Sequence, residues 1–134
     1  GGTCVNVGCV PSKNLTRAAE ELHNSQERRF PGITKEGRLS SFTDIIRQKR
    51  EMVADLRQEK YADVIADMED FEFIEGRGRL TSPKTVEVHG KSLFADAIPL
   101  ATGASPKIPP IPGLKDVPYL TNETAFELET LPKH

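Results

Sequence analysis

The residues of this chain best suited to chemistry are its two cysteines, Cys4 and Cys9, which lie just before an amphipathic segment. In a regular helix such a pair would be about 8–9 Å apart between Cα atoms, whereas a disulfide tolerates at most about 7 Å. A bond between them therefore requires an irregular, tightened turn, and Gly8 supplies backbone freedom for it. Such a bond closes a loop of only about six residues and stabilises a fold by about 2 kcal/mol. The spacing thus suits thiol–disulfide exchange better than structural stabilisation.

Other interpretations of the two cysteines stay open at this point. Free cysteines are often small buried apolar residues, and the pair could also form a structural bridge or part of a metal site. A structural zinc site needs four Cys or His ligands in paired short spacings. The histidines are instead scattered singly along the chain, which disfavours zinc: His23, His89 and His134.

A helix is predicted directly after the cysteines, beginning at Pro11 and Ser12. Its apolar residues follow the helical i, i+3, i+4, i+7 pattern: Leu15, Ala18, Ala19 and Leu22. Both sulfurs then precede a helix N-terminus, where exposed amides and the macrodipole favour a thiolate.

A second, longer helix is predicted over residues 42–68, with Ser41 as its N-cap and Asp44 three positions on. Its apolar stripe is interrupted once, by Lys49, and Tyr61 is interpreted as a core or boundary residue. The opposite face is charged and is interpreted as solvent-facing: Arg47, Arg50, Glu51, Asp55, Arg57 and Glu59.

After Asp70 the apolar residues alternate with polar ones, which predicts short antiparallel strands: Phe71, Phe73, Val86 and Val88. Turns are predicted at residues 82–83 and 89–90, and residues 76–78 on their own suggest a hairpin turn. Residues 97–101 are predicted to form a short buried strand ended by residues 102–103. Pro99 is awkward there, because proline cannot donate to a strand ladder.

Residues 2–13, GTCVNVGCVPSK, resemble the active-site signature of the class I flavin-dependent pyridine nucleotide-disulfide oxidoreductases. Within that family, Val5, Val10 and Ser12 are most similar to the mercuric reductase branch. The stretches at residues 101–106 and 108–114 resemble the same branch. The resemblance spans essentially the whole chain.

The resemblance implies roles for individual residues. Cys4 would be the interchange thiol that meets the substrate, and Cys9 would lie against FAD. The two together would capture Hg(II), since soft thiolates select soft metals. Lys13 would lie beside the reactive edge of the flavin. The remaining implied FAD contacts are Gly2, Thr3, Gly8, Arg77, Gly78, Ala101, Thr102 and Gly103.

The expected fold is therefore α/β: part of an FAD-binding, Rossmann-like domain of a flavin disulfide reductase, with helices and a small antiparallel β-meander. Residues 1–105 would belong to that domain. Residues 106–134, with five prolines between 106 and 118, would connect to an NADPH-binding domain. No Gly-x-Gly-x-x-Gly fingerprint occurs, and the chain starts without Met, so we interpret it as an internal piece that would not turn over alone.

Composition is that of a soluble globular protein: 134 residues, 37% hydrophobic and 28% charged, with a formal net charge of −2. These values give no electrostatic reason to expect nucleic-acid binding. No apolar run approaches the roughly 18 residues that span a bilayer. The family implies a cytoplasmic homodimer that uses NADPH. The alternatives are a dihydrolipoamide dehydrogenase or glutathione reductase type of enzyme, or a non-catalytic thiol module for soft metals.

Overall fold

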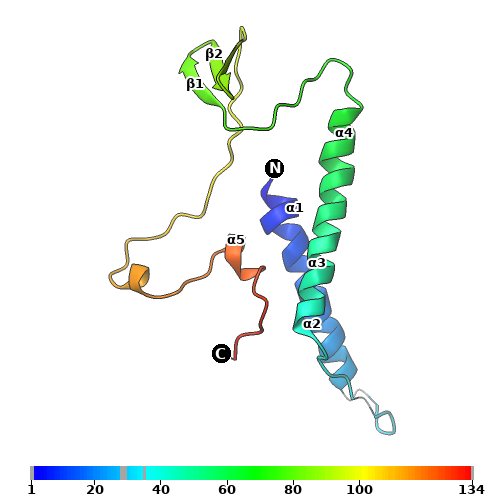
Figure 1. Ribbon diagram of the computed structural model, residues 1–134. Coiled ribbons are helices and arrows are strands. Elements are labelled where there is room, and N and C mark those ends of the chain that lie inside the picture. Colours follow the sequence, from blue (N-terminus) through cyan, green and yellow to red (C-terminus); the bar gives the residue numbers. More distant parts are fainter. Residues whose placement is uncertain (1, 28–29, 35, 134) are drawn as a thin grey trace.

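Two long helical segments lie side by side and form the body of the molecule (Figure 1). The computed structural model describes residues 2–27, 30–34 and 36–133; His134, considered above as a metal ligand, lies outside them. The first segment is α1 (Thr3–Val7) followed by α2 (Cys9–Gln26). The second is α3 (Phe42–Arg57), continued by a π-helical turn η1 (Gln58–Ala62) and by α4 (Asp63–Ala66). The cysteine segment therefore begins one of the two helical columns.

Helix α3 begins where the sequence predicts. The Oγ of Ser41 accepts a hydrogen bond from the backbone N–H of Asp44 at 3.1 Å, which satisfies one of the amides that a helix N-terminus leaves without a partner. The predicted amphipathic stretch over residues 42–68 is helical as far as Ala66, so this prediction is confirmed. None of the helices in the described part of the chain is both long and apolar enough to cross a bilayer.

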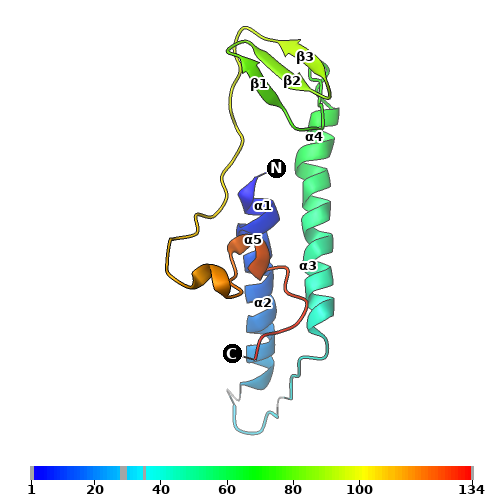
Figure 2. The ribbon, with the colours of Figure 1, turned by 60° about the vertical axis from the view of Figure 1, so that its left-hand side comes forward.

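A three-stranded antiparallel sheet lies beyond the end of α4 (Figure 2). Its strands β1 (Arg79–Ser82), β2 (Thr85–Val88) and β3 (Lys91–Phe94) pair in the order β1-β2-β3. In this register Val86 pairs with Leu80 on one side and Leu93 on the other. The predicted meander and its two turns are confirmed. The second turn places His89 at φ 50° and Gly90 at φ 74°.

Two predicted strands are absent from the described residues. Residues 71–75 form no strand, and the side chains of Phe71 and Phe73 are exposed. Residues 97–101 also run outside any strand, with Leu100 at 69% exposure. A strand exists only when its backbone pairs with a neighbour, and no strand of the described chain pairs with either segment.

The predicted hairpin turn at residues 76–78 is also wrong. These residues lie against β2, because a Cβ at Gly76 would be only 2.8 Å from Cγ2 of Val88. The Nε2 of His89 also lies 2.7 Å from the carbonyl oxygen of Glu75. Glycine at position 76 therefore lets this segment pass close to the strand.

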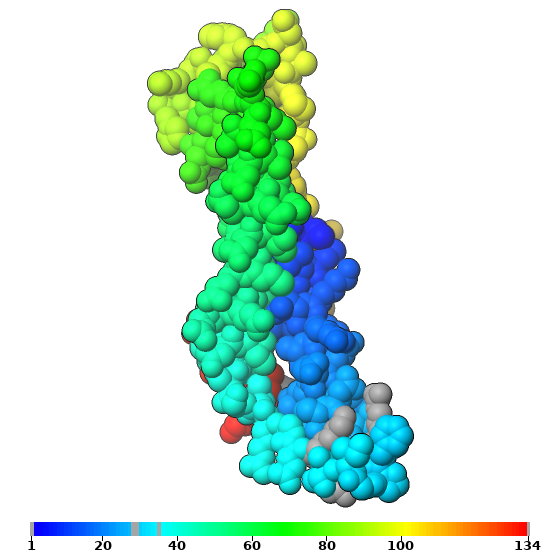
Figure 3. Space-filling view, turned by 90° about the vertical axis from the view of Figure 1, so that its right-hand side faces the viewer, coloured from blue at the N-terminus to red at the C-terminus, as the bar shows by residue number. Residues whose placement is uncertain are grey.

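The molecule is long and narrow, with the sheet at one end of the helical column (Figure 3). Among the described residues the buried large apolar side chains are Ile46 in α3 and Val88 in β2. From the sheet the chain returns along an extended connection to a 3-10 turn η2 (Leu114–Asp116) and a short helix α5 (Asn122–Ala125). Figures 1 and 2 both place α5 close to the first two helices.

Candidate redox site

The two cysteines lie on either side of a helix interruption. Cys4 is in the first turn of α1, and Cys9 is the first residue of α2. Between them Gly8 has φ −131° and ψ −112°, which is not helical. The sequence placed the helix start at Pro11 with both sulfurs before it; the helix instead starts at Cys9, and Cys4 has a helical turn of its own. The irregular junction expected at Gly8 is present.

Gly8 is required at this junction by packing. A Cβ at position 8 would lie 2.9 Å from the carbonyl oxygen of Thr3 and 3.4 Å from the Cα of Cys4. Both are backbone atoms, which cannot move aside as the end of a flexible side chain could. The absence of a side chain therefore lets the start of α2 approach the backbone that carries Cys4.

Both cysteines are free thiols and exposed, and Cys9 lies close enough to Cys4 to affect the pKa of its thiol. The pKa of the Cys4 thiol is raised, chiefly by its side-chain hydrogen bond with Cys9. A backbone hydrogen bond from Cys9 and the positive charge of Lys13 lower that pKa, as expected near a helix N-terminus, but they are outweighed. The arrangement therefore holds two adjacent thiols and keeps Cys4 protonated to a higher pH than an isolated cysteine.

A groove of about 450 Å³ lies beside the cysteine segment, and two distant parts of the sequence form it. Gly2 and Thr3 lie on one side, and Thr102 and Gly103 lie on the other. Gly2 has φ 93° and Gly103 has φ 72°, a conformation that favours glycine. The remaining residues that line the groove are Asn6, Val7, Ala104 and Ser105.

This lining suits the polar parts of a large cofactor such as FAD. The hydroxyl groups of Thr3, Thr102 and Ser105 can donate and accept hydrogen bonds, and the two glycines leave the backbone open to close approach. Three further predicted FAD contacts lie near the groove. Gly8 follows the groove residue Val7 in sequence, and exposed Ala101 precedes the groove residue Thr102. Exposed Lys13 lies on the adjoining helix α2. Arg77 and Gly78 are not brought to this groove, since a Cβ at Gly78 would meet Val86 of the sheet.

Tyr61 is half-buried, as its interpretation as a boundary residue predicts, and the structure also places it near the cysteine segment. A Cβ at Gly2 would lie 3.1 Å from the hydroxyl oxygen of Tyr61. Tyr61 belongs to the π-helical turn η1, and such turns occur often at functional sites. Helical periodicity alone gives no sign of this turn.

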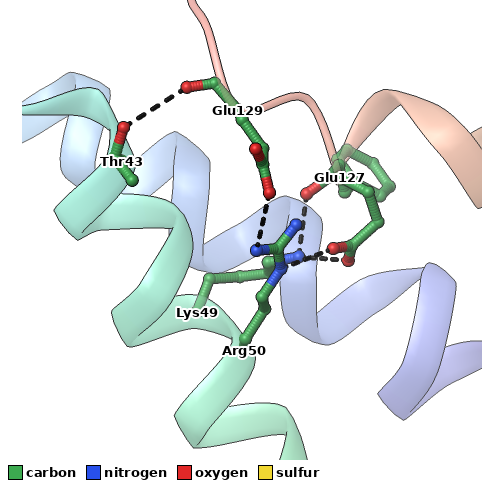
Figure 4. Close-up of polar contacts among 6 residues, drawn as sticks. Thr43, Lys49, Arg50, Glu127 and Glu129 are labelled. Carbon is green, nitrogen blue, oxygen red and sulfur yellow. Dashed lines mark hydrogen bonds and ion pairs between the residues drawn. The ribbon is translucent and has the colours of Figure 1, made fainter.

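The residues on the charged side of α3 are exposed as predicted, but Arg50 among them and the neighbouring Lys49 also contact a distant segment of the chain (Figure 4). Lys49, which interrupts the apolar stripe, is buried with 1% exposure and donates to the carbonyl oxygen of Phe126 at 2.8 Å. It also pairs with the carboxylate of Glu127. Arg50 donates through Nε to Glu127 at 2.8 Å and through a terminal nitrogen to Glu129 at 3.2 Å. Both cations therefore bind a segment far along the chain.

The whole chain, residues 1–134, matches the pyridine nucleotide-disulphide oxidoreductase family, and the chain belongs to that family. Among its relatives, the mercuric reductase of Lysinibacillus sphaericus is 44% identical over 133 residues, which cover 99% of this chain and 24% of that protein. The mercuric reductase of Staphylococcus aureus is 40% identical over the same shares of both chains. This chain thus spans about a quarter of the length of these curated relatives.

A solved structure agrees with this assignment. The HOCl-induced flavoprotein disulfide reductase RclA from Escherichia coli matches 98% of this chain and 27% of its own, with a TM-score of 0.74 and 29% sequence identity. The expected fold class, helices with a small antiparallel sheet from a flavin disulfide reductase, is confirmed.

Proposed function

We propose that this chain is part of an FAD-dependent mercuric reductase, which reduces Hg(II) to Hg(0) with NADPH. The observation that carries the proposal is the pair of free, exposed thiols of Cys4 and Cys9, which lie on either side of the non-helical junction at Gly8. The 44% identity to a mercuric reductase over 99% of the chain supports the choice of substrate.

The thiols suit a soft metal ion as substrate. Hg(II) prefers sulfur ligands, and two adjacent thiols can bind it together, each losing its proton. In the overall reaction NADPH gives up a hydride and becomes NADP⁺, Hg(II) takes the two electrons and leaves as Hg(0), and one proton is released. Cys4 would meet the substrate, and Cys9 would be the thiol nearer to the cofactor.

The cofactor would be held largely by the groove beside the cysteines. When bound, FAD would accept electrons from NADPH and pass them toward the metal ion or the dithiol. Gly2, Thr3, Thr102 and Gly103 line the groove. We propose further FAD contacts at Gly8, Lys13, Arg77, Gly78 and Ala101 in the complete domain.

The wider proposals follow from the family. Residues 1–105 would belong to the FAD-binding domain, and residues 106–134 would lead toward the NADPH-binding domain. The complete enzyme would be a cytoplasmic homodimer.

The test is the oxidation of NADPH by the full-length protein, followed by absorbance with and without Hg(II). We expect mercury-dependent oxidation that falls to background in Cys4→Ser and in Cys9→Ser, since one thiol can neither chelate the ion as a pair nor form an internal disulfide. Thr16→Ala, an exposed change on α2, is the matched control and should leave activity unchanged. Wild-type turnover in either cysteine variant would refute the proposed roles.

A second candidate is a reductase of a small disulfide, which the structural match to RclA favours. NADPH oxidation driven by glutathione disulfide or lipoamide, without a response to Hg(II), would identify it. A non-catalytic thiol module would instead bind Hg(II) and show no NADPH oxidation with any acceptor.

A further inference from the structure

Residues 121–129, here called the C-terminal brace, contact the body of the molecule at two separate places. At one end of the brace, Glu127 pairs with Lys49 and Arg50 of α3, and the hydroxyl of Thr43 donates to the carbonyl oxygen of Glu129 at 3.5 Å (Figure 4). At the other end, Nδ2 of Asn122 donates to the carbonyl oxygen of Val7 at 3.1 Å.

The attachment to α3 is firm because it involves a buried charge. Lys49 is 1% exposed, and an ammonium group taken out of water is tolerated only when it is paired and hydrogen-bonded. Partial burial by itself would raise the pKa of Glu127, but hydrogen bonds from Lys49 and Arg50 outweigh it and lower that pKa. The segment supplies the carbonyl group of Phe126 and the carboxylate of Glu127 that bind the buried lysine.

The contact at Asn122 falls between the two cysteines. Val7 is the last residue of α1, and its carbonyl group belongs to the peptide that joins α1 to Gly8. The last carbonyls of a helix have no partner within that helix, and Asn122 supplies one. The short stretch from Asn122 to Glu127 includes α5, which is capped at Thr121 by hydrogen bonds with Glu123 and Thr124.

We propose that the C-terminal brace positions the cysteine pair, with Asn122 and the Lys49–Glu127 pair as its positioning residues. The proposal deepens the proposed function, because it concerns how the same dithiol is held. Its physical basis is the conformational flexibility of the backbone at Gly8, where α1 and α2 meet. Gly8 is required there by packing, but glycine restricts its own torsion angles least of all residues, so an outside contact must hold the Val7–Gly8 peptide in place.

The test compares Asn122→Ala, Glu127→Gln and Lys49→Met with wild type in the full-length protein. The first readout is the equilibrium with glutathione, in which the dithiol forms a disulfide while one glutathione disulfide becomes two glutathione molecules. The second readout is the pH profile of iodoacetamide alkylation at Cys4, quantified by peptide fragmentation. Alkylation needs no cofactor or substrate, so it tests the brace even if the proposed enzymatic function fails.

We expect each variant to lower the equilibrium constant for disulfide formation about two- to tenfold, the range for one lost hydrogen bond. The alkylation of Cys4 should also shift to lower pH, because its thiol loses part of the hydrogen bond with Cys9. Arg47→Ala is the matched control on α3, since Arg47 is largely exposed and pairs with Asp44 of the same helix at 2.7 Å.

Gly90→Ala distinguishes a positioning role of the brace from a general loss of stability. This change strains a distant turn at φ 74° and should lower stability without changing either thiol readout. Glu127→Gln is a milder change that keeps the shape of the side chain. It keeps the proposal testable if the Lys49 variant does not fold. Unchanged thiol readouts in folded Asn122→Ala and Glu127→Gln would overturn the proposal. Loss of mercury-dependent NADPH oxidation in wild type would instead count against the proposed function alone.

Discussion

Replacing Gly8 by alanine should separate the two thiols. The new methyl group would lie 2.9 Å from the carbonyl oxygen of Thr3 and 3.4 Å from the Cα of Cys4, and the first contact is too short to persist. Because both neighbours are backbone atoms, relief requires α1 and α2 to move apart. Overpacking of this kind costs about 1–3 kcal/mol, and alanine returns about 0.4–1 kcal/mol by restricting the unfolded chain. A net loss between about 0 and about 2.6 kcal/mol, with a central value of about 1.3 kcal/mol, is therefore expected.

The chemical consequence is a change in the protonation of Cys4. The hydrogen bond with Cys9 is the main reason that the pKa of Cys4 is raised, so separation of the thiols should lower it toward the ordinary value. The rate of iodoacetamide alkylation at Cys4, measured against pH in the full-length protein, should rise at lower pH in Gly8→Ala than in wild type. Disulfide formation in a glutathione buffer should be weakened in parallel.

Gly90→Ala is the matched control for this experiment. Nothing lies within 4 Å of a Cβ at Gly90, so the change adds no clash, and the left-handed backbone costs about 1–2 kcal/mol. It should therefore match the stability loss without altering the alkylation profile. An unchanged profile in Gly8→Ala, or an equal shift in Gly90→Ala, would refute the argument that Gly8 sets the approach of the thiols.

Three further predictions concern other parts of the chain. Ser41→Ala should lower stability to urea by about 1 kcal/mol, because the Asp44 amide loses its cap, whereas Ser41→Thr should keep most of it. The pKa of Glu127 is lowered, so its ion pairs stabilise the fold fully at pH values above the pKa of this residue in the unfolded chain, and the stabilisation is lost as pH falls through its pKa in the folded protein. Urea unfolding measured from about pH 6 down to about pH 3 should show this loss of stability. Glu127→Gln should make the stability depend less on pH over the same range. If Cys9 lies beside FAD as we propose, the oxidised enzyme should show long-wavelength absorbance in Cys4→Ser, where no disulfide can form at Cys9, and should lack it in Cys9→Ser; the opposite pattern would reverse their roles.

The parts of the fold that were predictable are those that neighbouring residues determine. Ser41 and Asp44 form a cap within a single turn, and the alternation around Val86 with a turn on each side indicates a hairpin strand. The two missing strands show the limit of this reasoning. The pattern at Phe71 and Phe73 is typical of a strand, but a strand also needs a partner, and the pattern does not say whether one lies alongside.

The candidate site divides in the same way. The sequence by itself determined the identity and spacing of Cys4 and Cys9, the glycine between them and therefore the kind of chemistry available. Only the tertiary structure decided that Thr102 meets Thr3 across a groove, that Asn122 reaches the carbonyl of Val7, and that Lys49 is buried against Glu127, 78 positions later. Residue type and spacing set local conformation, whereas burial and long-range pairing depend on which distant surface packs against a residue. An interrupting lysine in an apolar stripe consequently shows that a partner is needed, but not which residue it is.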